Sequence, residues 1–217
     1  MRVFHSTNGK VQGGQLEGAI AAAGEAAKLL SSTGGEIRFF VAGVAGEEVN
    51  GTVFTIEYES AEALGAASDA LNEDIELQAL LNRLNAPTSP IVITSQTMGM
   101  EMPIGRTPKA GRGSILEVHT LHVTPGRIVD AVAEAAEVCE FMEANGAVNA
   151  RLIQLTYAGM ASGLLALTCE HENMRAHARA GEAWMSDAGM ALQMKTMGSA
   201  APSTTRVMSG LYTEIPL

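Results

Sequence analysis

The sequence predicts an α+β protein that contains two copies of one β-α-β-β-α-β unit. Three observations lead to this prediction. A shift of 111 to 114 residues places the apolar pattern of the first half on that of the second, both halves have the same order of extended and helical segments, and a stretch rich in glycine and proline separates them. With 47% hydrophobic and 18% charged residues, the 217-residue chain can bury a core.

The first helix of each half is indicated by apolar residues at helical spacing. In the first half these residues follow one another at steps of four and three: Leu16, Ile20, Ala23, Ala27 and Leu30. A shift of 112 gives the equivalent set in the second half: Ile128, Val132, Ala135, Cys139 and Met142. Glycine is the usual residue just beyond a helix end, so we expect the two helices to end at Gly34 and Gly146.

The remaining elements follow in the same order in both halves. Extended runs rich in Val, Ile, Phe and Tyr are expected at 3–6, 36–42 and 52–59, and at 115–122, 149–157 and 163–170. A long helical stretch comes next, at 60–84 and at 172–197, and a last extended run in each half ends near Glu101 or Glu214. This β-α-β-β-α-β order is the ferredoxin-like order.

The segment 102–113 is predicted to be a linker between a first repeat at 1–101 and a second at 114–217. Proline and glycine alternate in it with Arg106, Lys109 and Arg112, which either form a small anion site or, as we favour, only keep the linker solvated. A ferredoxin-like sheet carries helices on one face only. We therefore expect the two sheets to cover each other by packing face to face.

With two such units in one chain, the sequence resembles the dimeric α/β-barrel superfamily in its fused, two-repeat form. The families that it looks like are the antibiotic-biosynthesis-monooxygenase-like, NIPSNAP and EthD-type proteins, and the superfamily includes cofactor-independent monooxygenases, isomerases and haem enzymes. The resemblance implies a small-molecule pocket between sheet and helices, and a homodimer or larger homo-oligomer. It rests on element order and the repeat, and a fold alone does not choose a reaction.

The charge balance disfavours two classes of partner. The 14 Lys and Arg against 24 Asp and Glu give a net charge of −10, which repels nucleic acids and anionic membrane surfaces. We find no signal-peptide pattern at the N-terminus and no apolar run near the ~20 residues that cross a bilayer. The expectation is a cytoplasmic protein with a small-molecule substrate and two reduced thiols, Cys139 and Cys169.

Duplicated polar residues on the predicted strands are the catalytic candidates. A histidine can accept a substrate proton while an arginine stabilises the resulting anion, so His119 with Arg151 is the preferred pair and His5 with Arg38 its counterpart. The open alternative is that these side chains are structural. Strand alternation places two sets on the helix-facing side: Phe54, Ile56, Tyr58 and Leu165, Leu167, Cys169. Further substrate-binding candidates are Glu57, Thr168 and Trp184.

No metal site and no cofactor are predicted. His171 and His177 are six residues apart, whereas ligands on one helix face are three or four apart, and Glu170 and Glu172 flank His171 at a strand end. The haem-degrading members of the superfamily that the chain resembles combine a strand asparagine with a tryptophan and a later helical histidine. No histidine follows Trp184, so haem is not expected, although His171 or His177 could serve as an axial ligand. The phosphate-binding glycine motifs of nucleotide sites are also missing from the sequence.

The function predicted from these residues is cofactor-independent proton transfer on a small molecule. The reaction is either monooxygenation of a phenol or enol, or an isomerase or lyase step on a related carbonyl compound. The alternatives are a non-catalytic ligand-binding or assembly protein, and a haem-binding barrel protein. An enzyme should contain a cavity of about 300 to 1,000 Å³ against the more polar face of the sheet, whereas an assembly protein should have that face filled.

Overall fold

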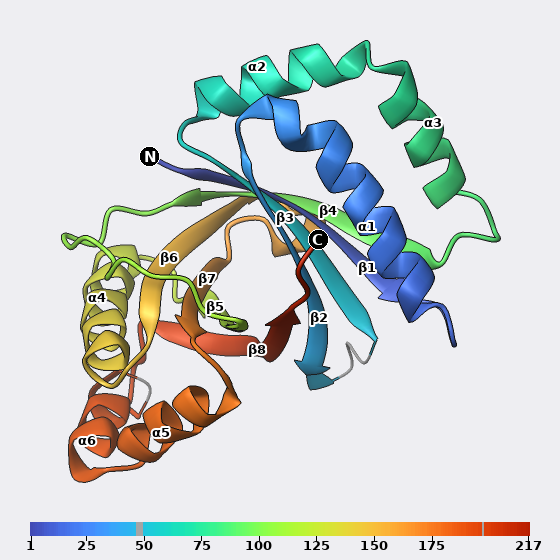
Figure 1. Ribbon diagram of the computed structural model, residues 1–217. Helices are drawn as coiled ribbons and strands as arrows, with labels where there is room; N and C mark the ends of the chain where they lie inside the picture. The colour runs from blue at the N-terminus through green and yellow to red at the C-terminus, as the bar shows by residue number, and fades with distance from the viewer. Residues whose placement is uncertain (47–49, 197) are drawn as a thin grey trace. The chain divides into compact units, whose positions relative to one another are not determined.

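The computed structural model describes residues 1–46, 50–196 and 198–217 (Figure 1). The first half contains β1 (Val3–Val11), α1 (Leu16–Leu30), β2 (Glu36–Val44), β3 (Gly51–Tyr58), α2 (Ala61–Asn72), α3 (Ile75–Leu84) and β4 (Ile91–Glu101). The second half contains β5 (Ile115–Val123), α4 (Ile128–Ala144), β6 (Val148–Tyr157), β7 (Leu165–His171), α5 (Met174–Trp184), α6 (Asp187–Thr196) and β8 (Thr204–Glu214). The predicted β-α-β-β-α-β order is therefore present in both halves.

The chain consists of two compact units. The first contains 1–100 with 156–160 and 213–217, and the second contains 101–155 and 161–212. The strand order is β4-β1-β3-β2 in the first unit and β8-β5-β7-β6 in the second. The strands pair antiparallel at β1–β3, β1–β4, β2–β3, β5–β7 and β6–β7. Each unit thus has a ferredoxin-like fold. The face-to-face packing of the two sheets stays a prediction.

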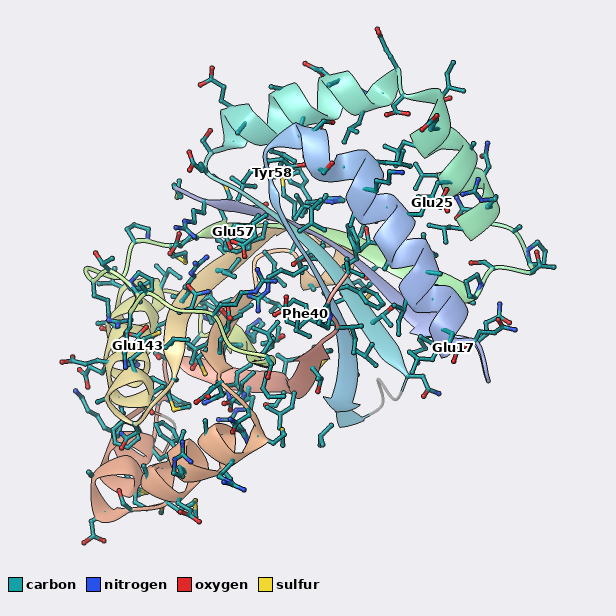
Figure 2. The ribbon with its side chains drawn as sticks, in the orientation of Figure 1. Glu17, Glu25, Phe40, Glu57, Tyr58 and Glu143 are labelled. Carbon is teal, nitrogen blue, oxygen red and sulfur yellow. The ribbon has the colours of Figure 1, made fainter. Side chains whose placement is uncertain are left out.

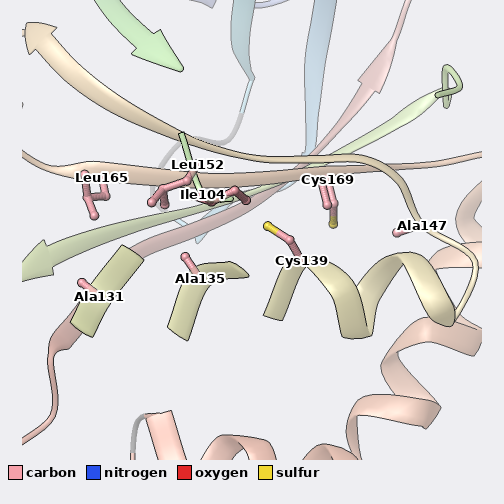
Figure 3. Packing of buried hydrophobic residues seen from close by; sticks show 9 residues of the cluster. Ile104, Ala131, Ala135, Cys139, Ala147, Leu152, Leu165 and Cys169 are labelled. Atoms are coloured by element: carbon pink, nitrogen blue, oxygen red, sulfur yellow. The ribbon is translucent and has the colours of Figure 1, made fainter. Parts of the chain in front are cut away.

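Helices cover one face of the sheet in each unit. In the first unit Ile56 and Tyr58 of β3 pack with Leu30 at the end of α1 and Ala67 of α2 (Tyr58 is labelled in Figure 2). In the second unit α4 packs its small side chains against the sheet, as Figure 3 shows for Ala131, Ala135 and Cys139 against Leu152, Leu165 and Cys169. The helix-facing sets predicted from strand alternation are confirmed, since both sets belong to these two cores.

Each long helical stretch is broken into two helices, where the sequence pattern predicted one. In the first unit Asp74 follows the end of α2, and its carboxylate accepts hydrogen bonds from the backbone N–H groups of Glu76 and Leu77 at 2.9 and 3.0 Å. A new N-cap of this kind starts a new helix in a new direction. In the second unit the break falls at 185–186, and Met197 lies outside the described residues. Among the described helices, none is long and apolar enough to cross a membrane.

Replacing Asp74 with alanine is expected to lower the free energy of unfolding by about 1 kcal/mol. The reason is that the N–H groups of Glu76 and Leu77, the second and third residues of α3, lose their acceptor, and loss of an N-cap side chain has an effect of about 0.5 to 2 kcal/mol. Urea denaturation measures the change. Asp69→Ala, at an exposed position inside α2, is the matched control and should cause no loss. Equal losses in both variants would contradict the capping role of Asp74.

The predicted linker has no helix or strand in 102–113, yet it is fixed to the second unit. The N–H of Met102 donates to the carbonyl of Leu152 at 2.8 Å, and the N–H of Lys109 donates to the Glu143 carboxylate at 2.8 Å. Arg106 forms an ion pair with the same buried carboxylate (Glu143 is labelled in Figure 2). The segment is therefore attached along its length to α4 and β6, and Arg106 is neutralised within the protein.

Candidate functional site

A cavity of about 190 Å³ lies in the second unit, between the helix-facing side of the sheet and the helices α4 and α5. Most of its wall is apolar, with Leu121, Ala135, Val138, Met142 and Leu167 among the lining residues. The polar residues of the wall are Glu117, His119, Glu134, Thr168, His177, Thr196, Thr204 and Arg206. The position agrees with the pocket between sheet and helices that the resemblance implies, but it is not on the more polar face of the sheet, where the cavity of an enzyme was expected. The volume is below the range of about 300 to 1,000 Å³ expected for an enzyme.

Glu117 is the centre of a polar cluster at one end of this cavity. One carboxylate oxygen, Oε1, lies 2.8 Å from Nε2 of His119. The other, Oε2, lies 2.9 Å from Nε2 of His171, 3.6 Å from Nε2 of His177 and 3.7 Å from Sγ of Cys169. His171 is fully buried, whereas the Glu117, His119 and His177 side chains are 13 to 24% exposed. Three histidines and a thiol thus surround one carboxylate.

Strand pairing explains why these residues meet. Glu117 and His119 alternate on β5 and so lie on one face, as do Cys169 and His171 on β7. In the antiparallel register Glu117 is opposite Cys169, and residues directly opposite one another have neighbouring side chains. The chain then turns at Asn173, whose side chain accepts from the N–H of Ala176 at 3.0 Å and starts α5. The first turns of α5 return His177 to the cluster.

The surroundings of Glu117 keep its carboxyl ionised. Burial by itself raises the pKa of this group, but hydrogen bonds from His119 and His171 and the charges of His119 and His177 outweigh burial and hold the pKa well below its usual value. A carboxylate only accepts hydrogen bonds, so Nε2 of His119 is the donor in its contact with Glu117. The other nitrogen of His119, Nδ1, lies 2.8 Å from the hydroxyl of Ser209 on β8 and acts as its acceptor when the ring is neutral.

The two cysteines are poor nucleophiles in this environment. Burial raises the pKa of the Cys139 thiol to about 12. Burial, and after it the charge of Glu117, raises the pKa of the Cys169 thiol well above its usual value. The reactive form of cysteine is the thiolate. Both thiols are therefore in the unreactive form, which agrees with their expected reduced state.

The structure does not bring His119 and Arg151 together. His119 is opposite Leu167 and Arg151 is opposite Thr168, and since these two β7 residues are adjacent, their partners lie on opposite faces of the sheet. His119 reaches the cavity, while the buried Arg151 is directed to the other face. The predicted base and anion stabiliser thus cannot act on one substrate atom. The prediction rested on spacing along each strand, whereas the register between strands decides whether His119 and Arg151 share a face.

The predicted counterpart pair is separated in the same way. His5 is opposite Ile56 and Arg38 is opposite Thr55, so they too lie on opposite faces. Burial lowers the pKa of His5. Arg38 forms an ion pair with Glu214 at 2.7 Å and lies 4.7 Å from the ring centre of Phe40. These contacts give Arg38 a structural role, which is the alternative that the sequence left open for the arginines.

The three predicted substrate-binding residues have different places. Glu57 forms an ion pair with Arg2 in the first unit, away from this cavity. Thr168 and Trp184 both line the cavity, and the Trp184 ring meets Phe141 edge to face at a centroid distance of 5.5 Å. The cavity therefore confirms that these two residues are beside a pocket, but what they bind stays a prediction.

Four residues of the cluster were missed as site residues in the sequence reasoning: Glu117, Cys169, His171 and His177. The premise used against a metal site, the six-residue spacing of the two histidines, is wrong for this fold. His171 ends a strand and His177 lies on the following helix, and their ring centroids are 5.1 Å apart. A signal was present. Glu-x-His in β5 and Cys-x-His in β7 each place two metal-ligand residue types on one strand face.

Haem does not suit this cavity. A porphyrin is larger than many drug-sized ligands, whose sites span about 300 to 1,000 Å³, and the cavity here has about 190 Å³. The two candidate axial ligands, His171 and His177, both direct Nε2 toward Glu117. The donors therefore converge on a point between them and not on the plane of a macrocycle.

Comparison with known proteins places the fold. No family model and no curated protein sequence matches this chain. A solved structure from Fusobacterium nucleatum, assigned provisionally to the monooxygenases, aligns over 98% of this chain and 93% of its own, with a TM-score of 0.63 and 8% identity. An anthrone oxidase-like protein aligns over 99% and 92% (TM-score 0.57, 13% identity). The chlorite dismutase of Candidatus Nitrospira defluvii aligns over 99% and 91% (TM-score 0.57, 10% identity).

These likenesses establish the fold. The neighbours are ferredoxin-like proteins of the dimeric α/β-barrel superfamily, which the order of elements had indicated. At such low identities the likeness does not extend to the site. Substrate and reaction must therefore be argued from the residues around the cavity.

Proposed function

We propose that the protein is an enzyme that transfers a proton to or from a small, mainly apolar molecule in the cavity of the second unit. The observation that carries this proposal is the position of His119. It lies at the wall of an apolar cavity, with Glu117 at 2.8 Å from one ring nitrogen and Ser209 at 2.8 Å from the other. A histidine oriented by a carboxylate is the arrangement of a general base.

The hydrogen bonds define the role of each group. Because the Glu117 carboxylate accepts the Nε2 proton, Nδ1 is the basic nitrogen of neutral His119. The Ser209 hydroxyl, at 2.8 Å from Nδ1, can pass a substrate proton to it or be displaced by a substrate hydroxyl. The imidazolium formed in either case is stabilised by the Glu117 charge. Arg206 takes the place proposed earlier for Arg151, since it is the arginine that lines the cavity and can face a substrate anion.

A phenol or enol with one or two rings is the substrate class that suits these walls. The cavity offers aliphatic side chains and Trp184 to the rings, and its few polar groups gather near His119. Similarity to an anthrone oxidase-like protein and to a protein assigned to the monooxygenases supports an oxygenation. In that reaction O₂ is the oxidant: a CH₂ group becomes C=O, and the second oxygen atom leaves as water with the two hydrogens.

His119→Gln and His119→Ala are expected to lower turnover by about 100-fold or more, the usual effect of removing a general base. The measurement is oxygen uptake and product formation with a panel of monocyclic and bicyclic phenols and enols. His122→Gln, at an exposed position of the same strand, should leave turnover unchanged. Full activity in both His119 variants would refute the role of His119. Native mass spectrometry that finds tight binding of such a molecule, without turnover by the wild type, would favour a carrier and overturn the enzyme proposal.

A further inference from the structure

Three side-chain atoms at the inner end of the cavity lie close enough together to hold a metal ion, within 4.8 Å of one another. From Oε2 of Glu117 the distances are 2.9 Å to Nε2 of His171 and 3.7 Å to Sγ of Cys169. Sγ of Cys169 lies 3.5 Å from Nε2 of His171. We infer that Glu117, Cys169 and His171 bind one transition-metal ion of the Zn²⁺ type, with His177 as a neighbour of Glu117 at 3.6 Å.

The distances agree with tetrahedral coordination. Zinc bonds to O, N and S have lengths of 2.0 to 2.3 Å, so that pairs of ligands in a tetrahedron are about 3.3 to 3.8 Å apart. The separations of 3.5 Å between Cys169 and His171 and of 3.7 Å between Glu117 and Cys169 lie in this range, and the fourth position of the tetrahedron is left to water or a bound molecule. The contact of 2.9 Å between Glu117 and His171 is a hydrogen bond without the ion, and it would lengthen by about 0.4 Å when Zn²⁺ replaces the shared proton.

The donor types select the class of metal. One imidazole, one carboxylate and one thiol form a mixed N, O and S set, which suits Zn²⁺ and similar first-row ions. Mg²⁺ and Ca²⁺ prefer oxygen ligands and would have a single carboxylate oxygen here. The binding of Zn²⁺ displaces the thiol proton of Cys169, so the ion would also relieve the contact between a buried thiol and a carboxylate.

The equivalent place in the first unit has a different composition. The cross-strand pair that corresponds to Glu117 and Cys169 is Val3 and Tyr58. Val3 stands two residues before His5 on β1, as Glu117 stands two residues before His119 on β5, and the strand pairing is the same in both units. Val3 and Tyr58 are both buried, with exposed fractions of 1 and 2%. An apolar residue and a tyrosine are thus sufficient for close packing at this position of the fold. The ionisable groups of the second unit therefore require an explanation other than packing.

The burial of His171 is the strongest sign of a ligand. The side chain has no exposure, and its Nε2 lies 2.9 Å from Oε2 of Glu117 and 3.5 Å from Sγ of Cys169. An imidazole is unfavourable to bury with so few polar contacts unless it has another use. The backbone of Gly113 covers His171 so closely that a Cβ at this position would lie 2.3 Å from the His171 carbonyl oxygen. The backbone of His171 at the end of β7 is therefore closely packed.

The proposed ion is compatible with the role proposed for His119. The metal would use Oε2 of Glu117, while Oε1 continues to accept from Nε2 of His119. Glu117 and Cys169 also line the cavity, so an ion bound to them would be next to a bound molecule. The inference itself does not depend on the protein being an enzyme, because its test measures metal binding and not turnover.

The test is a titration of chelator-treated wild-type protein with Zn²⁺ and with Co²⁺. We expect one ion per chain by calorimetry. The Co²⁺ complex should show the visible bands of tetrahedral cobalt and the near-ultraviolet band of a sulfur-to-cobalt bond. Mg²⁺ should not compete. A folded wild type that binds no ion at this stoichiometry, or a Co²⁺ complex without tetrahedral and sulfur bands, would overturn the inference.

Matched variants locate the ion. His177→Ala, at a partly exposed position beside Glu117, is expected to weaken Zn²⁺ binding by about 10- to 100-fold, the usual effect of losing an outer partner of a ligand. Cys169→Ser should abolish the sulfur band, and Cys139→Ser should keep it. His122→Ala is the control for adventitious surface binding. With folding verified by circular dichroism, unchanged binding in His177→Ala, or weakened binding in His122→Ala, would overturn the assignment.

Discussion

The Leu152→Ala variant, treated with a chelator, is expected to have a free energy of unfolding about 2 to 5 kcal/mol lower than that of the wild type. Leu152 has an exposed fraction of 0% and lies in the core between β6, β7 and α4. Its removal eliminates apolar contacts and leaves a space that the small residues of α4, among them Ala131 and Ala135, are too short to fill. The effect is large because the surrounding backbone cannot move far enough to close the space that the Leu152 side chain leaves.

Urea denaturation followed by circular dichroism measures this loss. Leu16→Ala is the matched control, because Leu16 is 45% exposed at the start of α1 and its truncation should change stability by about 0.5 kcal/mol or less. If the Leu152 variant were as stable as the control, the tight packing of α4 on the sheet would be wrong.

Glu117→Leu in the metal-free protein is expected to lower the free energy of unfolding by about 3 kcal/mol. The carboxylate accepts short hydrogen bonds from His119 and His171, and a hydrogen bond to a charged group contributes about 1.5 to 3 kcal/mol. The loss is greatest at His171, because the imidazole is fully buried and would have no acceptor left at Nε2. His119 can turn to water, which limits its share.

The double variant Glu117→Leu, His171→Leu distinguishes an unsatisfied polar group from a packing defect. When both partners become apolar, the buried imidazole is gone and most of the lost stability should return. The core of the first unit supports this expectation for Glu117, since the apolar Val3 is buried at the equivalent position. Glu172→Leu, on the exposed neighbour of His171, is the control and should have little effect. A double variant less stable than Glu117→Leu would contradict this account.

The elements of the fold could be read from the sequence because their signals are local. The apolar stripe from Leu16 to Leu30 and its counterpart from Ile128 to Met142 each predicted a helix, and both helices are present. Strand alternation correctly placed Ile56 and Leu167 on the helix-facing side. The breaks at Asp74 and at 185–186 were missed, because an apolar pattern can continue through a change of helix direction. The homo-oligomer implied by the resemblance stays a prediction.

The candidate site depended on distances that only the tertiary structure decides. Which strand face a residue occupies can be counted within a strand, but whether His119 and Arg151 share a face depends on the register between β5, β7 and β6, and that register separates them. Glu117 and His171 are 54 residues apart, and pairing of β5 with β7 places their side chains within 2.9 Å. The sequence by itself determined which residues could react or bind. Antiparallel pairing and the turn at Asn173 determined which of them meet, because a side-chain cluster is produced by backbone hydrogen bonds between distant segments.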